Sequence, residues 1–132
     1  MGAGSFVMPE MRVVVYRGED GTLPLIDWLG ELKPKKARAK CLHLVELLRQ
    51  EGHDLRRPHA DILRDGIHEL RTHLGSVQYR ILYFFHAGTA VLSHGFIKYK
   101  AKVPDKEINA AIARQESYIK NPERHAQEDE LS

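Results

Sequence analysis

The 132-residue sequence contains a single cysteine, Cys41, and no long apolar run. One cysteine excludes an internal disulfide and a zinc site built from cysteines. No stretch approaches the roughly 18 consecutive apolar residues that a membrane-spanning helix needs. The opening MGAGSFVMPEMR lacks the basic patch and apolar core of a signal peptide. We therefore expect a cytoplasmic protein that does not enter the membrane.

Several catalytic signatures are also missing. The sequence has no glycine-rich phosphate loop, no G-x-S-x-G elbow and no H-E-x-x-H helix. None of its eight histidines forms a pair with the spacing of a known ligand set, and His68 and His73 have opposite parity within one predicted strand. Cys41 lies on the apolar stripe of a predicted helix, which is typical of a buried, inert thiol. We expect no metal and no cofactor.

The composition is sufficient for one domain, because 42% of the residues are hydrophobic and domains usually run to roughly 50–200 residues. The net charge of +2 is unevenly distributed. Residues 105–132 contain four basic and seven acidic residues, whereas the first 104 contain 16 basic and 11 acidic residues. The basic part ends in the alternating Lys98, Lys100 and Lys102. A charge run usually marks only a solvated surface. The position of these lysines in the chain therefore matters more than the total net charge.

Hydrophobic spacing predicts seven elements, with apolar residues at i, i+3, i+4 and i+7 in helices and with β-branched or aromatic runs in strands. Pro24 and Pro104 are expected to begin helices, and Gly52 and Pro122 to end them. The expected elements are a strand at 11–17, helices at 25–32 and 37–48, strands at 67–73, 77–85 and 90–98, and a helix after Pro104 whose apolar face is Ile108, Ala111, Ile112, Gln115 and Ile119.

This order, β-α-α-β-β-β-α, predicts an α+β fold with an antiparallel sheet of about four strands. The helical hairpin would cover one face of the sheet, and the first strand would lie at or near an edge. The other face is expected to be partly open and to serve as a working surface. We expect one domain over residues 11–121, an N-terminal extension over 1–10 and a polar tail over 122–132, of which residues 125–132 are expected to be frayed.

Two arginines are expected to face each other in this sheet. A two-residue link at Gly75-Ser76 pairs Leu74 with Val77 and so places Arg71 opposite Arg80. Like charges directly opposite on a ladder repel. A phosphate between them would explain the arrangement, since arginine forks match phosphate oxygens. The alternative is that each arginine pairs with a nearby carboxylate, Glu69 or Asp61.

The face on which Lys98 lies depends on the register of the next hairpin. A two-residue link pairs Arg80 with Gly95 and sends Lys98 to the opposite face, whereas a three-residue link with a bulge brings His94, Phe96 and Lys98 to the face of Arg80. The sequence leaves both open.

A basic strip follows Lys98. The strip, Tyr99, Lys100 and Lys102, combines lysines with an aromatic ring, as contact with an RNA backbone and base stacking require. Tyr79 has the parity opposite to Arg80, which favours a place in the core.

These residues carry a family resemblance over about Val13 to Tyr118. The chain resembles the HigB-type, phage-derived host-killer toxins of the RelE/ParE superfamily. The matching elements are E-L-R at 69–71, Y-R at 79–80, H-G-F-x-K at 94–98, a lysine-rich link to a proline, and A-x-x-R-x-x-x-Y at 111–118. Members commonly have a second lysine where Tyr99 stands and a threonine where Val103 stands. The resemblance implies the family's small sheet with two N-terminal helices, in agreement with the order above.

The resemblance also implies a function. Such toxins of type II toxin–antitoxin systems are ribosome-dependent mRNA endonucleases (mRNA interferases) that use no metal, and a small helix-turn-helix antitoxin of the HigA kind neutralises them. In the reaction, a 2′-OH attacks the adjacent phosphate. Arg71, Arg80 and Lys98 would stabilise the developing charge, and Lys98 or His94 would transfer a proton. A normal lysine is fully charged, so Lys98 would need a lowered pKa for that role.

Two other functions compete with this one. A ParE-like toxin shares the scaffold but binds DNA gyrase without catalysis, and an RNA-binding module would lack both activities. A gyrase binder needs no converging cations, so the expected cluster of Arg71, Arg80 and Lys98 favours the endonuclease.

Overall fold

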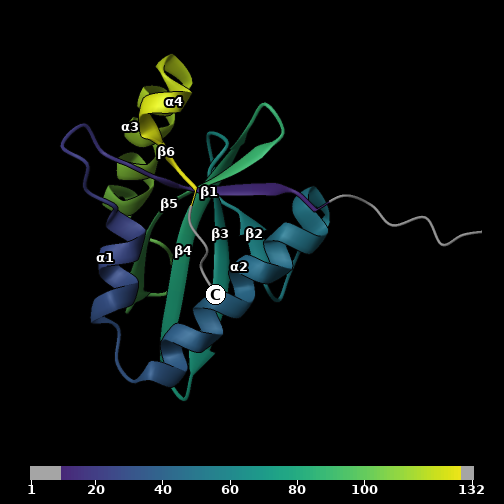
Figure 1. Ribbon diagram of the computed structural model, residues 1–132. Helices are drawn as coiled ribbons and strands as arrows, with labels where there is room; N and C mark the ends of the chain where they lie inside the picture. Colours follow the sequence, from purple (N-terminus) through teal and green to yellow (C-terminus); the bar gives the residue numbers. More distant parts are fainter. Residues whose placement is uncertain (1–9, 129–132) are drawn as a thin grey trace, which may run out of the picture.

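The computed structural model describes residues 10–128, in which helices and a mainly antiparallel sheet form an α+β fold (Figure 1). In chain order they are β1 (Arg12–Tyr16), α1 (Pro24–Glu31), α2 (Lys35–Glu51), the 3-10 turn η1 (Gly52–Asp54), β2 (Ala60–Ile62), β3 (His68–Leu74), β4 (Val77–His86), β5 (Thr89–Lys98), α3 (Asp105–Lys120), α4 (Pro122–His125) and β6 (Ala126–Gln127). The seven predicted elements are all present, and η1, β2, α4 and β6 are additional.

The predicted helix boundaries are confirmed. Pro24 is the first residue of α1, where a missing N–H costs nothing. Gly52, with φ of 54°, ends α2 in a conformation that suits glycine. Pro104 precedes α3, whose first turn carries Asp105 and Glu107, both favourable at the positive end of a helix dipole.

The sheet differs from the predicted four antiparallel strands. It has six strands in the order β2-β3-β4-β5-β1-β6, and β1 pairs with β5 in parallel. The first strand does lie near an edge, with only the two-residue β6 outside it. Strands of two or three residues are too short to show a period, and the direction of β1 is set by the crossover through α1 and α2 that a parallel pair requires.

Both faces of the sheet carry helices, so the face that was predicted to be partly open is covered where α3 packs on it. Helices α1 and α2 bury one face, with Val15, Leu70 and Tyr83 among the sheet residues beneath them. Helix α3 covers the other, against Leu82 and Phe84. The apolar stripe of a helix must be buried somewhere, and the stripe of α3 finds its partner on the face that was expected to be open.

The buried residues of α3 differ from the predicted apolar face at the end of the helix. Ile108 and Ala111 are buried as predicted, whereas Ile119 is exposed and Tyr118 fills the core in its place, edge-on to Phe84. A helix of this length that crosses a twisted sheet changes the residue it presents from one turn to the next, which shifts the buried position by one residue.

A close helix–sheet contact explains one glycine of the H-G-F-x-K segment. A Cβ on Gly95 would meet the ring of Trp28 at 2.2 Å. Strand β5 therefore accepts the Trp28 ring of α1 only because residue 95 has no side chain. Gly95 thus secures the packing of α1 on the strand that carries His94 and Lys98.

The expectation of a frayed end over residues 125–132 is wrong for residues 125–127. Pro122 opens α4, and Ala126 and Gln127 pair with β1. His125, in α4, is buried and stacks on the ring of Tyr16 at 5.2 Å between centroids. The remaining tail residues and most of the N-terminal extension lie outside the described residues.

Candidate functional site

The predicted arginine pair is confirmed. Strands β3 and β4 pair Leu74 with Val77 across the Gly75-Ser76 turn, and this register places Arg71 directly opposite Arg80. Gly75, with φ of 60°, allows the tight turn. The two arginines therefore share one face of the sheet.

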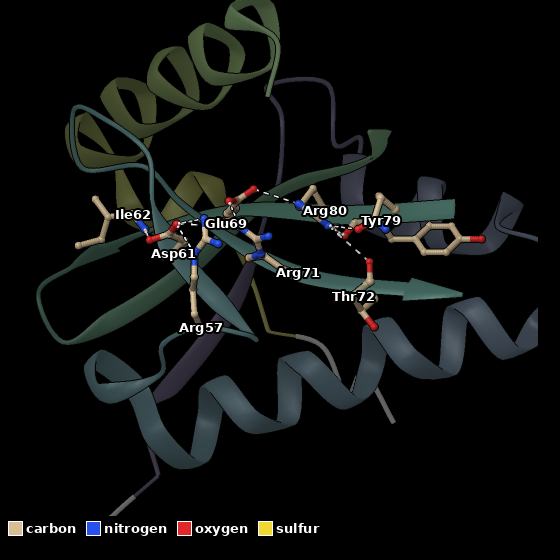
Figure 2. A network of polar contacts seen from close by, with 9 residues as sticks. Arg57, Asp61, Ile62, Glu69, Arg71, Thr72, Tyr79 and Arg80 are labelled. Atoms are coloured by element: carbon tan, nitrogen blue, oxygen red, sulfur yellow. Dashed lines mark hydrogen bonds and ion pairs between the residues drawn. The ribbon is translucent and has the colours of Figure 1, made fainter. Parts of the chain in front are cut away.

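Glu69 occupies the position at which both guanidinium groups meet (Figure 2). Its Oε2 lies 3.2 Å from Nη1 of Arg71, and its Oε1 lies 3.1 Å from Nε of Arg80. Asp61 is farther away, 3.9 Å from Arg71, and pairs with Arg57 at 2.8 Å. The carboxylate alternative therefore describes the arginine pair in this structure, with Glu69 as the shared partner.

The Glu69–Arg80 contact is buried and imperfect. The side chains of Arg80 and Glu69 are only 2% and 5% exposed. Among the described residues, neither Arg80 Nε nor Glu69 Oε1 has an aligned hydrogen-bond partner. Nη1 of Arg80 donates to the carbonyl of Tyr79 at 3.0 Å. Burial lowers the pKa of Arg80, and the Glu69 carboxylate opposes that shift. Arg80 remains a cation, since a guanidinium does not lose its proton in proteins.

Two cations share one carboxylate, so the cluster keeps excess positive charge, and it opens to solvent. A hollow of about 160 Å³ adjoins it, lined by Pro58, Arg71, Thr72, His73, Gln78 and Arg80. The lining contains no acidic residue, and the Arg71 side chain is 23% exposed. The arrangement fits an anion that approaches from the β3 edge, because guanidinium forks match phosphate oxygens.

The structure resolves the register that the sequence left open, and it combines features of both alternatives. The β4–β5 link is the two-residue turn Ala87-Gly88, yet a bulge at Ser93 shifts the pairing so that Arg80 faces Phe96 and Gln78 faces Lys98. His94, Phe96 and Lys98 therefore lie on the face of Arg80. The bulge lies within the strand rather than in the turn.

Lys98 is partly buried beside the arginine pair. Burial lowers its pKa, and the positive charge of Arg80 lowers it further. A lowered pKa makes a lysine a better proton donor near neutral pH. The bulge thus places Lys98 on the face of the arginines, one of the two alternatives that the sequence left open, and Lys98 does not itself line the hollow.

His94 lies elsewhere, beneath α3. Its Nε2 is 3.0 Å from Oε1 of Glu107, and its Nδ1 is 3.0 Å from Nη1 of Arg114 and 2.8 Å from Oγ of Ser93. An arginine donates only, so Nδ1 accepts and Nε2–H donates to Glu107. Burial, and then Arg114, lower the pKa of His94, while Glu107 opposes them. His94 does not line the hollow beside Arg80.

Glu107 and Arg114 were not predicted as members of any polar cluster. Arg114 belongs to the A-x-x-R-x-x-x-Y segment, and its guanidinium also stands 5.9 Å from the centre of the Tyr16 ring. The signal was available in the sequence, because Glu107 and Arg114 lie seven residues apart, two turns of α3 on one helical face. The sequence could not identify His94 as their partner, because it left the register of the β4–β5 hairpin, and so the face of His94, undecided.

The basic strip lies in the link between β5 and α3. Tyr99 is 87% exposed, and Lys100 and Lys102 are exposed as well. The strip begins directly after Lys98, so it extends the positive charge of Arg71, Arg80 and Lys98 along the surface. A large exposed ring among cations is a platform on which a base can stack.

Residues 10–128 contain neither an accessible thiol nor a cluster of metal-binding side chains. Cys41 is fully buried on α2, and burial raises its pKa to about 12. Within residues 10–128, no three histidine, cysteine or acidic side chains gather closely enough to hold a metal ion. No helix in that range has the length and apolar character to cross a membrane.

The sequence of residues 27–116 matches the family described as Phage derived protein Gp49-like (DUF891). The chain belongs to this family. The matched range runs from α1 into α3 and contains Arg71, Arg80 and Lys98. The Gp49-like family is a toxin-type family related to the RelE/HigB-like toxins, and membership suggests a phage-derived toxin of a toxin–antitoxin system. No curated protein matches this Gp49-like chain.

Proposed function

We propose that this Gp49-like chain is a HigB-type toxin of a type II toxin–antitoxin system that cleaves mRNA on the ribosome without a metal ion. The observation that carries the proposal is the placement of Arg71, Arg80 and Lys98 on one face of the sheet, where Arg71 and Arg80 line a hollow free of acidic residues. A toxin that only binds a protein has no need of three converging cations.

The proposed reaction transfers a phosphoryl group within the RNA. The 2′-OH gives its proton to a water molecule and attacks the adjacent phosphorus. The bond from phosphorus to the 5′ oxygen breaks, and the leaving oxygen takes up a proton from Lys98. The products are a 2′,3′-cyclic phosphate and a 5′-OH end. Arg71 and Arg80 stabilise the charge that develops on the phosphate oxygens.

Lys98 is the proposed donor of the proton to the leaving oxygen. Its lowered pKa supports that role, because a general acid works best when its pKa is near the working pH. Both ring nitrogens of His94 are already engaged beneath α3, so we propose that His94 supports the fold of the site rather than transferring a proton. Tyr99, Lys100 and Lys102 are proposed to contact the RNA or the ribosome.

Expression of the chain without a partner tests the proposal. The wild-type chain is expected to stop growth and to create new transcript 5′ ends, and Arg80→Ala to restore growth with cleavage reduced by about 10²–10³-fold, the usual loss for one charge-stabilising donor. Circular dichroism of the purified variant checks that it folds. A matched control is Arg12→Ala, which removes an exposed arginine paired with Glu128 at the N-terminal end of β1.

The outcomes separate the rival functions. If folded Arg80→Ala stays fully toxic, the assigned site is wrong. If the wild-type chain is toxic but leaves transcripts intact and inhibits supercoiling by DNA gyrase, it is a ParE-like toxin. Co-expression with its antitoxin, which we expect to be a small helix-turn-helix protein, is expected to abolish toxicity.

A further inference from the structure

A second hollow, of about 330 Å³, lies between α2 and the edge of β3. From α2 it is lined by the apolar side chains Ala39 and Leu44 and by the basic or imidazole side chains Lys36, Lys40 and His43. An apolar wall edged by cations offers a surface for a flat ring and charges for a neighbouring anion.

The charge around this hollow is of one sign. None of its lining residues is acidic, and the first turn of α2 has no acidic residue either. Within residues 10–128, every ion pair uses an arginine or a histidine as the cation, so neither Lys36 nor Lys40 has a carboxylate partner. Both lysines are therefore available to phosphates.

The hollow shares one lining residue, Thr72, with the hollow of the arginine site, which consists of Arg71, Arg80 and Glu69. Thr72 lines both the α2 hollow and the hollow beside Arg71 and Arg80, and in Figure 2 its side chain points toward α2 while Arg80 lies on its other side. Strand β2 pairs with β3 only at residues 68–70, so the β3 edge at Thr72 has no neighbouring strand in the described structure. Pro58 and His59 lie beside this edge, because the His59 carbonyl accepts from the Arg71 N–H, and they line one hollow each. An RNA strand that occupies both hollows would therefore pass over Pro58 and His59.

We propose that the α2 hollow is a nucleotide subsite, which holds a nucleotide of the same RNA strand beside the one cleaved. The base lies against Ala39 and Leu44, and Lys36 and Lys40 contact the flanking phosphates. This inference rests on the proposed function. An RNA strand fits better than an acidic protein segment. Its successive phosphates can contact the cations of both hollows, and its planar base can pack on the apolar side chains of the α2 hollow.

Binding of an uncleavable RNA tests the subsite directly. The probe is a fluorescein-labelled hexaribonucleotide with a 2′-O-methyl group at every position, which lacks the attacking hydroxyl. Ala39→Leu fills the hollow without a change of charge, and Lys40→Gln removes one cation. Each is expected to weaken binding about three- to tenfold by fluorescence anisotropy, the Lys40→Gln loss shrinking at high salt. Lys120→Gln, near the end of α3, is the charge-matched control and is expected to bind as the wild type does.

Imidazole signals locate the bound nucleotide. His43 and His59 line the hollow, so their proton NMR signals are expected to shift on titration with 5′-AMP, while that of the remote His86 stays in place. Equal shifts with inorganic phosphate would mean that the hollow selects only an anion, and the nucleotide subsite would then be wrong.

The remaining outcomes distinguish this inference from the proposed function. If the wild-type chain does not bind the hexanucleotide, or if Ala39→Leu and Lys40→Gln bind it normally, the subsite is wrong even where transcripts are cut in an Arg80-dependent manner. If those two variants bind RNA normally but fail to bind the antitoxin, the hollow is a protein interface. If binding depends on the hollow but transcripts stay intact, the subsite stands and the catalytic proposal fails.

Discussion

Two arginine–carboxylate clusters lie on the same face of the sheet, and they differ in charge balance and in access. In the arginine site, Arg71 and Arg80 share Glu69 beside a hollow that opens at the β3 edge. In the cluster beneath α3, His94 lies between Glu107 and Arg114. The arginine site keeps excess positive charge, whereas the charges beneath α3 balance.

This difference shows that residue types alone do not mark a functional site. Both clusters contain an arginine and a carboxylate, and both lie within segments that resemble the toxin family. Only the arginine site combines unbalanced charge with an opening, and that combination is what an anionic substrate requires. The cluster beneath α3 instead ties the helix to strand β5, the strand that carries Lys98.

The largest expected effect follows from removing the carboxylate shared by the two arginines. Glu69→Gln leaves the guanidinium of Arg80, which is 2% exposed, without a counter-charge. Breaking a buried pair in this way costs about 3–5 kcal/mol. We therefore expect the free energy of unfolding, measured with urea, to fall by that amount.

The matched variant in the other cluster is Glu107→Gln. Its side chain is 22% exposed, and the amide oxygen of glutamine still accepts from Nε2 of His94. We expect a loss of about 1 kcal/mol or less, the usual value for one hydrogen bond between neutral groups. Equal losses for Glu69→Gln and Glu107→Gln would remove the distinction between the clusters.

The second prediction concerns the proton that Lys98 is proposed to donate. Lys98→Gln is expected to lower transcript cleavage about 10²-fold, and Lys98→Arg nearly as much, because arginine keeps the charge but does not release a proton. Mapped 5′ ends quantify cleavage. If Lys98→Arg is as active as the wild type, Lys98 supplies charge alone and the proton comes from another group.

The third prediction concerns the exposed ring next to that lysine. Tyr99→Ala is expected to weaken binding of the methylated hexanucleotide by about 1–3 kcal/mol, the value of one stacked base, whereas Tyr99→Phe keeps the ring and the affinity. An unchanged affinity of Tyr99→Ala would show that the strip does not contact single-stranded RNA.

The sequence predicted those parts of the site that follow from local rules. The pairing of Arg71 with Arg80 depends only on a two-residue turn and a period of two, and it is confirmed. The helix ends at Pro24, Gly52 and Pro104 follow from backbone geometry, and they too are confirmed.

The parts that could not be predicted depend on contacts distant in sequence. The bulge at Ser93 decides the face of His94 and Lys98, and Ser93 is buried against the cluster that includes Arg114 of α3. Strand β6 exists only because it meets β1, at the opposite end of the chain. Neither contact leaves a periodic signal in the sequence.

The smallest expected effect is a pH dependence of stability that comes from His94. Burial, and then Arg114, hold the pKa of His94 below the 6.5 of an unperturbed imidazole. The unfolded chain therefore binds this proton more readily than the folded chain, and stability rises with pH where their protonation differs. The stability contributed by neutral His94 is fully present above pH 6.5 and is lost as the pH falls from there toward the lowered pKa.

His94→Gln should flatten this part of the curve of unfolding free energy against pH. His68→Gln is the control, because burial lowers the pKa of His68 as well, and it should leave the His94 contribution in place. If both variants keep the wild-type slope below pH 6.5, His94 is not held neutral between Glu107 and Arg114.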